Sequence, residues 1–222
     1  MTTFSSPEES LALLRAIRIV PVIVIDSPED AVPLARALAA GGLPCAEITF
    51  RTPRAGEALR RITAEAPELF VGAGTVLTPE QAREARAAGA QFMVAPGFNP
   101  RVVDYCLGRG MPVYPGVCTP TELEAALEKG LTTVKFFPAE PSGGLAFLKA
   151  MAAPYGDISF MPTGGVNANN VADYLGFNRV VACGGSWMAP SDWIAGKQFD
   201  RIRQESRRAS DIAHGRQPPV TV

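Results

Sequence analysis

The sequence predicts a single-domain (β/α)8 barrel with a short N-terminal helix. Apolar, strand-like runs recur at intervals of roughly 20 to 26 residues, and each is followed by a loop rich in Pro, Gly, Ser, Thr or Asn and then by a helical segment. The 222 residues suit one such barrel, whose core we place at about residues 17–195. An open doubly wound sheet is the alternative, because periodicity cannot show that a sheet closes. The runs centre near Val22, Glu47, Gly72, Val94, Val113, Val134, Phe160 and Val181.

The two ends of the chain frame this repeat. Ser6 and the acidic residues after it open a short amphipathic helix at about Pro7–Ile17, which we expect to act as a lid or cap. The β-branched run Ile19–Ile25 then predicts a parallel strand that is buried on both faces. A last helix is predicted from about Ser191 to Ala209, and we expect the polar tail at about 210–222 to fray.

Composition and charge argue against several classes of function. The net charge is −1 with both signs interspersed, so no basic face is available for a nucleic acid. No apolar run reaches the roughly 18 residues that cross a bilayer, and the N-terminus does not read as a signal peptide, so we expect a cytoplasmic protein without a membrane partner. The four cysteines are far apart, and the one histidine, His214, lies in the polar tail. We therefore expect neither a metal site nor a disulfide framework.

Chemically useful side chains occur where strands end, which is where (β/α)8 barrels carry their active sites. In the second strand, alternation places Glu47, Thr49 and Arg51 on one face, so a carboxylate and a guanidinium are expected to share the barrel interior. An internal ion pair that only fills the barrel is the alternative. At the end of the third strand, Gly72-Ala-Gly-Thr75 allows a close approach to the backbone and offers the Thr75 hydroxyl, although it could equally be a tight turn.

Proline and glycine mark the other strand ends. Pro96 and Pro115, each followed by glycine, end the fourth and fifth strands and are expected to shape a wall without adding charge. The pairs Gly164-Gly165 and Gly184-Gly185 follow the seventh and eighth strands, where this fold usually binds a phosphate group on backbone N–H groups. Ser186 adds a hydroxyl to the second pair. Glycine also serves tight turns, so the prediction of a phosphate site depends on both pairs together.

Lys135 is the charged residue of the sixth strand, in the run T-T-V-K-F-F-P-A-E, with Phe137 on the same side. Desolvating an ammonium ion is costly, so burial favours the neutral amine, a nucleophile that can form a Schiff base with a ketone. A lysine that reaches solvent or pairs with a carboxylate is the alternative. The joint presence of amine, carboxylate, arginine, hydroxyl and phosphate cradle at one end of a barrel favours an imine-forming enzyme that acts on a phosphosugar.

Several strand ends also carry recognisable segments, namely Glu47–Thr52, Gly72–Val76, Pro115–Glu122, Val134–Glu140, Pro162–Val166 and Gly184–Trp187. Together they resemble the class I 2-keto-3-deoxy-6-phosphogluconate (KDPG) aldolases, also called 4-hydroxy-2-oxoglutarate (KHG) aldolases. The resemblance extends from about Ile17 to Ala195. Two departures are small: Phe50 stands where leucine is common, and Ala95 stands where serine is common before Pro-Gly.

The resemblance implies a role for each matching residue. Lys135 would form the Schiff base, Glu47 would be the general acid and base, and Arg51 with Thr75 would hold the carboxylate of the pyruvyl group. The implied phosphate-binding residues are Gly164, Gly165, Gly184 and Ser186, and the implied pocket residues are Thr163, Phe137 and Pro96. The implied substrate is a phosphorylated keto acid, no cofactor or metal is implied, and the implied assembly is a homotrimer.

Three alternatives remain at the level of the sequence. A related aldolase could use a different aldehyde partner, acting on the galactonate epimer or releasing glyoxylate from 4-hydroxy-2-oxoglutarate. By resemblance, Thr163 favours the gluconate substrate over the galactonate epimer, because the galactonate-directed relatives tend to carry an apolar residue there. A phosphosugar isomerase or epimerase could use Glu47 as its base without forming an imine. A phosphate-binding barrel without activity could hold Lys135 and Glu47 as a structural pair.

Overall fold

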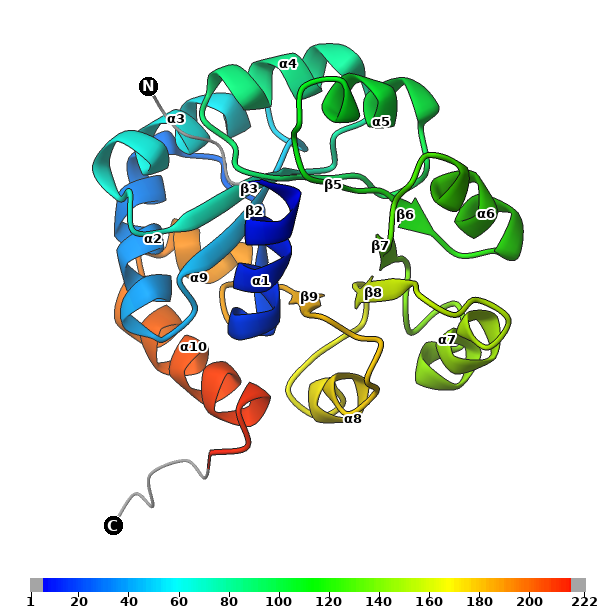
Figure 1. Cartoon of the computed structure of the whole chain (residues 1–222). Coiled ribbons are helices and arrows are strands. Elements are labelled where there is room, and N and C mark those ends of the chain that lie inside the picture. The colour runs from blue at the N-terminus through cyan, green and yellow to red at the C-terminus, as the bar shows by residue number, and fades with distance from the viewer. Residues whose placement is uncertain (1–5, 217–222) are drawn as a thin grey trace.

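Short parallel strands line the centre of the molecule and helices surround them (Figure 1). The structure is a computed structural model that describes residues 6–216. The strands are β1 (Ile19–Ile23), β2 (Cys45–Thr49), β3 (Phe70–Gly74), β4 (Met93–Val94), β5 (Val113–Tyr114), β6 (Gly116–Val117), β7 (Thr133–Phe136), β8 (Ser159–Pro162) and β9 (Cys183–Gly185). All but one of their residues are buried, as expected for strands that are covered by helices on one side and fill a barrel on the other.

The pairing of these strands closes a barrel. One set of neighbours runs β5-β4-β3-β2-β1-β9 and a second runs β6-β7-β8, with every pair parallel. Single bridges from Phe160 to Val180 and from Thr163 to Gly184 join the β8 side to the β9 side. Pro115 separates β5 from β6, so these two are one barrel strand split where proline has no N–H to donate. The predicted (β/α)8 barrel is confirmed, and the open sheet is excluded.

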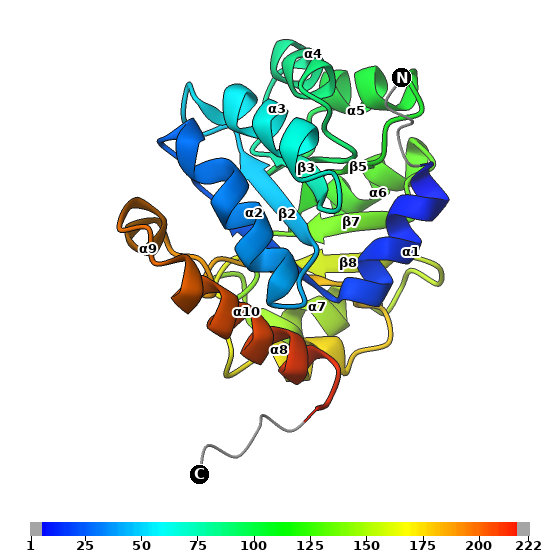
Figure 2. The ribbon, with the colours of Figure 1, turned by 90° about the vertical axis from the view of Figure 1, so that its left-hand side faces the viewer.

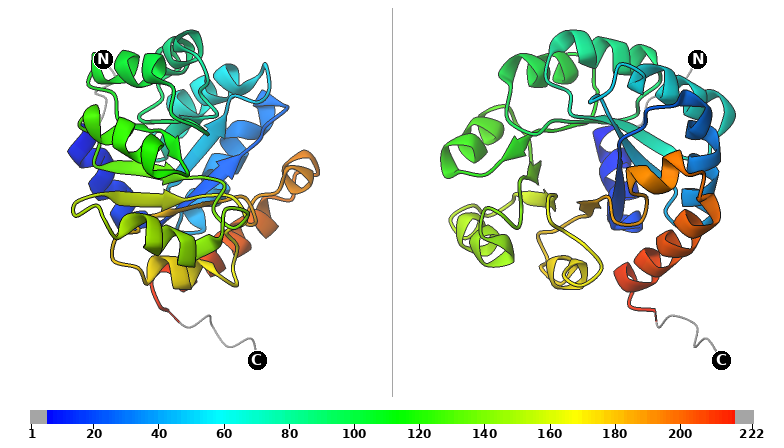
Figure 3. Two further views of the ribbon diagram at one scale, coloured as in Figure 1. Left: turned by 90° about the vertical axis from the view of Figure 1, so that its right-hand side faces the viewer. Right: turned by 180° about the vertical axis from the view of Figure 1, so that it is seen from behind.

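The outer ring of helices is clear when the molecule is seen from behind (Figure 3). Three of these helices begin with proline after a side-chain cap, where Thr78, Asn99 and Thr119 each accept a hydrogen bond from a backbone N–H of the first turn. The ring consists of α2 (Ala31–Ala40), α3 (Ala55–Glu65), α4 (Pro79–Ala87), α5 (Pro100–Leu107), α6 (Pro120–Glu128), α7 (Gly144–Ala152), α8 (Val171–Leu175) and α10 (Phe199–Ala213). The 3-10 turn η1 (Pro28–Asp30) precedes α2.

The N-terminal helix is confirmed as α1 (Pro7–Ile17), which lies at the end of the barrel where the strands begin. Ser6 and Glu9 form a capping box at its start, and the α1 residues Leu14 and Ile17 are buried. The Ser10 hydroxyl is 2.9 Å from the hydroxyl of Tyr114. Figure 2 shows α1 and α9 (Ser191–Ala195) at opposite ends of the barrel, so α1 caps the end remote from the strand exits.

The predicted C-terminal helix was wrong in two respects. It is interrupted at residues 196–198, where Lys197 has a positive φ of 53°, so α9 and α10 are separate helices. Helix α10 then continues to Ala213, which places residues 210–213 in a helix rather than in a frayed tail. The His214 ring lies 2.8 Å from the Ser210 carbonyl oxygen and 3.0 Å from that of Ala16. The final residues, 217–222, lie outside the described part of the chain.

Helix α10 is ordered to this length because one face of it packs against α2. Ser206 and Ala209 are buried on that face, and a side chain at Gly41 would collide with Ser206. None of the helices within residues 6–216 combines the length and apolar character that crossing a membrane requires.

Candidate active site

A cavity of about 420 Å³ opens at the end of the barrel where the strands exit, and α9 forms part of its rim. Its walls come from segments that are far apart in the chain: the ends of β1, β7, β8 and β9, and the loop after β2. This is the end at which barrels of this kind hold their active sites. Six of the predicted site residues line it, namely Arg51, Phe137, Thr163, Gly164, Gly165 and Ser186, whereas Lys135, Glu47 and Thr75 are not among its lining residues.

Lys135 points into the barrel because of its position in β7. Its neighbours Val134 and Phe136 are fully buried on the other side of the strand, where the Phe136 ring lies 6.1 Å from the Phe147 ring of α7. Lys135 is only 4% exposed, and its Nζ lies 5.0 Å from the centroid of the Phe137 ring. The amine is therefore held within a largely apolar barrel and close to an aromatic face.

Glu47 faces this amine from β2. Its Oε1 is 3.5 Å from Lys135 Nζ, the residue is 1% exposed, and Oε1 accepts no hydrogen bond from the described residues. Gly74 on β3 makes room for the carboxylate, since a side chain at that position would collide with it. The glycines of the third strand were expected to let another group approach the backbone closely, and that group is the Glu47 side chain. The buried pair combines a nucleophile with a group that can accept and return a proton.

Arg51 does not share the barrel interior, contrary to the prediction from alternation. Strand β2 ends at Thr49, which is buried and donates a hydrogen bond to the Ile23 carbonyl oxygen (2.8 Å). The chain then turns, so alternation no longer applies, and Arg51 lies exposed at the mouth of the cavity. Its Nε donates a hydrogen bond to Oγ1 of Thr75 (3.2 Å), a residue with a positive φ of 54°. A guanidinium and a hydroxyl therefore meet at the rim and can bind an anion there.

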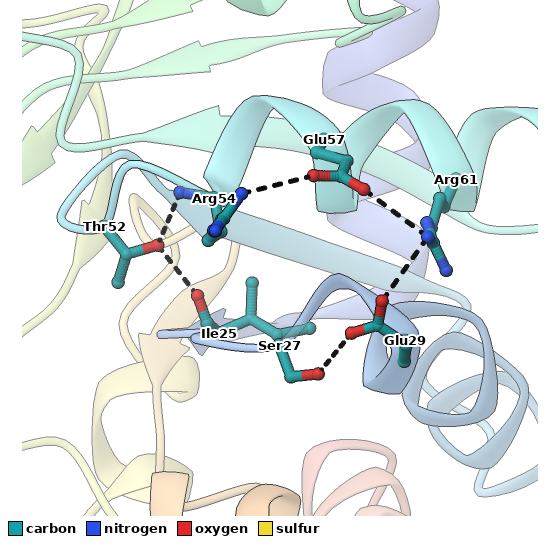
Figure 4. A network of polar contacts seen from close by, with 7 residues as sticks. All are labelled: Ile25, Ser27, Glu29, Thr52, Arg54, Glu57 and Arg61. Atoms are coloured by element: carbon teal, nitrogen blue, oxygen red, sulfur yellow. Dashed lines mark hydrogen bonds and ion pairs between the residues drawn. The ribbon is translucent and has the colours of Figure 1, made fainter.

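A polar network holds the loop that carries Arg51 (Figure 4). Thr52 donates to the Ile25 carbonyl oxygen (2.8 Å) and accepts from the N–H of Arg54 (3.3 Å), which ties the loop after β2 to the end of β1. The network continues from Arg54 through Glu57, Arg61, Glu29 and Ser27. Its ion pairs are exposed and individually weak, but together they restrict both loops.

The glycine pair after β8 forms the opposite wall. Gly164 and Gly165 have positive φ values of 99° and 84°, a backbone conformation that other residues adopt only with strain. In the second pair, Gly185 lines the cavity and Gly184 does not. Gly184 instead lies beneath Thr163, whose hydroxyl a side chain at that position would strike. Gly184 therefore supports the wall of which Gly185 is a part.

The other predicted pocket residues divide in the same way. Thr163 and Phe137 line the cavity, but Pro96 does not; its carbonyl packs against Gly116 beside the break in the fifth barrel strand. The sequence prediction missed several lining residues: Val22, Val24, Val166, Ala189, Pro190 and Ser191. Alternation along β1 could have indicated Val22 and Val24, but no local signal distinguishes an apolar wall residue from a core residue.

The cysteines are structural for the most part. Cys45, Cys106 and Cys183 are buried and Cys118 is partly exposed, with Sγ 3.0 Å from the Ser142 hydroxyl oxygen. Burial raises the pKa of the Cys106 thiol to about 12 and also raises the pKa values of the Cys45 and Cys183 thiols. Among the described residues, no group of three or more His, Cys, Asp or Glu side chains is arranged to hold a metal ion.

Known proteins of one family match this chain along most of its length. The family model for KDPG and KHG aldolase matches residues 11–205. The 2-dehydro-3-deoxy-phosphogluconate aldolase of Treponema pallidum is 53% identical over 199 residues, which cover 90% of this chain and 95% of that protein. The KHG/KDPG aldolase of Escherichia coli is 44% identical over 195 residues, which cover 88% of this chain and 92% of that protein.

Solved structures agree with these relatives. The KDPG aldolase of Legionella pneumophila, with pyruvate captured at low pH as a covalent carbinolamine intermediate, has a TM-score of 0.86 and 39% identity, covering 89% of this chain and 96% of that one. The Zymomonas mobilis enzyme with 3-phosphoglycerate has a TM-score of 0.87 and 37% identity, covering 93% and 97%. On the strength of the family match, these identities and the shared barrel, the chain belongs to the KDPG and KHG aldolase family.

Proposed function

We propose that this protein cleaves 2-keto-3-deoxy-6-phosphogluconate to pyruvate and glyceraldehyde 3-phosphate by class I aldolase chemistry, with Lys135 as the Schiff-base residue. The observation that carries the proposal is the buried contact between Lys135 Nζ and Glu47 Oε1 at 3.5 Å. Family membership favours this reading over an isomerase or epimerase and over a phosphate-binding barrel without activity. A cavity of about 420 Å³ is within the ~300–1,000 Å³ typical of small-molecule sites.

The reaction begins with proton transfer from the Lys135 ammonium to the Glu47 carboxylate, which yields a neutral amine. The amine attacks C2 of the keto acid and forms a carbinolamine. Glu47 then protonates the carbinolamine hydroxyl, water leaves, and a protonated imine remains on Nζ. At this point Glu47 is again a carboxylate, ready for the cleavage step.

In the cleavage step Glu47 takes the proton of the C4 hydroxyl. The C3–C4 bond breaks, its electron pair moves toward the iminium nitrogen, and glyceraldehyde 3-phosphate is released from the enamine of pyruvate. Glu47 returns its proton to C3 of the enamine, and water hydrolyses the resulting imine to pyruvate and the free amine. One carboxylate beside one amine can thus serve every proton transfer of the cycle.

The two ends of the substrate are anions, and we assign them to opposite walls. The substrate carboxylate binds Arg51 and Thr75, whose side chains are 3.2 Å apart at the mouth of the cavity. The phosphate binds the backbone N–H groups around Gly164 and Gly165, with the Ser186 hydroxyl and the neighbouring Gly185 as further contacts. Thr163 lines the same cavity, and we assign it to recognition of the sugar acid chain.

Borohydride reduction in the presence of pyruvate tests the chemistry directly. The expected result is an irreversible mass increase on the peptide that contains Lys135, because only an imine is converted to a stable secondary amine. Lys135→Ala should give no adduct. Lys149→Ala is the matched control, because Lys149 lies exposed on α7, whereas Lys135 is buried inside the barrel. If no adduct forms on Lys135 at saturating pyruvate, the proposed mechanism is refuted.

Substrate choice needs a separate test. We propose the gluconate epimer as the main substrate on the basis of Thr163, and 4-hydroxy-2-oxoglutarate as a second, because the E. coli relative is named KHG/KDPG aldolase. Parallel assays with both sugar acid epimers and with 4-hydroxy-2-oxoglutarate measure this preference. An equal or reversed preference for the galactonate epimer contradicts the assignment of Thr163.

The assembly and location are also proposals. We propose that the protein is a cytoplasmic homotrimer, as the family resemblance implies. Multi-angle light scattering should give about three times the 23.5 kDa mass of one chain. A monomeric mass at micromolar concentration contradicts the trimer, and recovery of the protein in a membrane fraction of cells contradicts the location.

A further inference from the structure

Glu140 and Tyr174 form a partly buried link that the reaction described above does not use. Tyr174, on α8, is the largest fully buried side chain among the described residues. Its hydroxyl donates a hydrogen bond to Oε1 of Glu140. Glu140 lies in the turn after β7, five residues beyond Lys135 in the sequence. Neither residue lines the 420 Å³ cavity. A fully buried tyrosine that is bonded to a carboxylate next to the active-site strand needs a structural or functional reason.

Glu140 touches the glycine pair after β8 through both its backbone and its side chain. Its N–H donates to the Gly164 carbonyl oxygen (2.9 Å), and the preceding N–H of Ala139 donates to Thr163 (2.8 Å). The Glu140 side chain lies over Gly165, where even a Cβ would collide with it. The turn after β7 therefore continues the β7–β8 ladder and holds the glycine pair from one side.

Two asparagines just before α8 hold the same loop. Asn167 and Asn170 each donate a side-chain amide hydrogen bond to the Gly165 carbonyl oxygen, at 3.0 and 3.2 Å. Asn170 also accepts from the N–H of Asn167 (2.8 Å) and stands at the start of α8, one turn before Tyr174. Figure 1 shows α8 outside β8 and β9, where the glycine loop leaves the barrel. The glycine loop is thus held by hydrogen bonds from Asn167 and Asn170 and by the contacts of Glu140, which Tyr174 of α8 holds in turn.

A pair of glycines needs such support if it is to bind an anion well. Glycine has the greatest backbone freedom, so an unsupported Gly164–Gly165 segment would lose much conformational entropy when its N–H groups were ordered around a ligand. A loop that is already held in the bound conformation avoids that loss. The supporting contacts must also be compatible with the positive φ values of Gly164 and Gly165. The contacts of Glu140 with these two residues form while both φ values are positive.

We propose that Glu140 and Tyr174 are positioning residues that hold the Gly164–Gly165 loop in place for the phosphate group of the substrate. The proposal builds on the proposed aldolase function, because it takes the glycine loop as the phosphate site. It predicts that loss of the link weakens recognition of the phosphate and leaves imine formation on Lys135 intact. Burial, and secondly the hydrogen bond to Glu140, raise the pKa of the Tyr174 phenol, so it stays protonated and donates at neutral pH.

The test uses Tyr174→Phe and Glu140→Gln, which remove a hydroxyl and a charge with little change of shape. Tyr155→Phe is the matched control, because Tyr155 donates to Glu124 (2.8 Å) in a similar Tyr–Glu pair away from the cavity. Each protein is assayed for kcat and KM with KDPG and with its unphosphorylated counterpart, 2-keto-3-deoxygluconate. Pyruvate trapping by borohydride and the affinity for glycerol 3-phosphate by calorimetry complete the set.

The expected result is a rise of about tenfold in KM for KDPG in both link variants, equivalent to about 1.4 kcal/mol. We expect kcat to stay within about twofold, KM for the unphosphorylated substrate and pyruvate trapping to be unchanged, and glycerol 3-phosphate to bind about tenfold more weakly. Tyr155→Phe should match the wild type in every assay. This split separates a positioning role from a general loss of stability, which would lower kcat for both substrates alike.

Two results overturn the proposal: an equal loss of kcat/KM on both substrates, or unchanged affinity for glycerol 3-phosphate in both variants. Glu140→Gln keeps the test decisive if Tyr174→Phe fails to fold, because the Glu140 side chain is exposed. A different result would refute the aldolase function, namely that the wild-type protein forms no borohydride-trapped adduct with pyruvate. Weaker glycerol 3-phosphate binding in the variants of such a protein would still support the link.

Discussion

The amine of Lys135 lies 3.5 Å from the carboxylate of Glu47, and both side chains are almost wholly excluded from solvent. The two residues come from β7 and β2, which are not neighbours in the barrel. Burying a charged pair is costly unless its geometry or its function compensates, and here Oε1 has no further hydrogen bond among residues 6–216. The pair is thus better explained by chemistry than by stability.

Lys135→Ala should abolish turnover, because Lys135 is the only buried lysine among residues 6–216. Glycerol 3-phosphate should still bind, because the glycine loop does not depend on the lysine. Steady-state kinetics and calorimetry on the same preparation measure both properties. A variant that only unfolds at a lower temperature and keeps substantial turnover would support a structural pair instead.

Glu47→Gln should lower kcat by about 10²–10⁴-fold, the usual contribution of a general acid or base, while the Lys135 adduct still forms slowly. The change removes proton transfer and keeps nearly the same shape. Glu57→Gln, on the exposed network of Figure 4, is the control and should leave kcat unchanged. A kcat for Glu47→Gln within threefold of the wild type would show that another group moves the protons.

Gly74→Ala should disturb the active site from the neighbouring strand, because the added Cβ collides with the Glu47 carboxylate. We expect a loss of about 1–3 kcal/mol in the free energy of unfolding, together with a lower kcat. Gly97→Ala is the matched control, since a Cβ there meets nothing within 4 Å. It should change stability by no more than about 0.5 kcal/mol. Urea unfolding monitored by fluorescence compares the two, and equal stabilities would refute this reading of Gly74.

Arg51→Lys should raise KM for KDPG by about tenfold with a smaller change in kcat, because lysine lacks the planar fork that binds both oxygens of a carboxylate. Arg54→Lys, three residues along the same loop, is the control and should behave as the wild type. The pyruvate concentration that half-saturates borohydride trapping provides a second measure and should rise in parallel. An unchanged value would remove Arg51 from carboxylate binding.

The thiols should differ sharply in reactivity. Because burial raises the pKa of the Cys106 thiol to about 12, and raises those of Cys45 and Cys183 as well, these three are protonated at pH 8 in the native state and shielded from reagents. Titration with Ellman's reagent at pH 8 should modify only the partly exposed Cys118 quickly, and all four thiols after unfolding. Rapid modification of more than one native thiol would contradict this picture.

Much of this protein can be predicted from the sequence. The alternation of strand-like and helical segments indicated the barrel, and alternation within β2 and β7 indicated that Glu47 and Lys135 point inward. The capping pattern at Ser6 correctly predicted α1. These features are local, because the side-chain direction in a strand and the start of a helix depend on residues that are close in sequence.

The tertiary structure decided what depends on residues far apart in the chain. Closure of the barrel rests on the pairing of β1 with β9 and on the bridge from Thr163 to Gly184, and neither is visible in a repeating pattern. Arg51 lies outside the barrel interior, where alternation had placed it, because β2 ends before this residue. Gly185 lines the cavity and Gly184 does not, because Thr163 packs on Gly184. The link between Glu140 and Tyr174 is of the same kind. Such contacts follow from register and packing between elements, which short-range propensities do not determine.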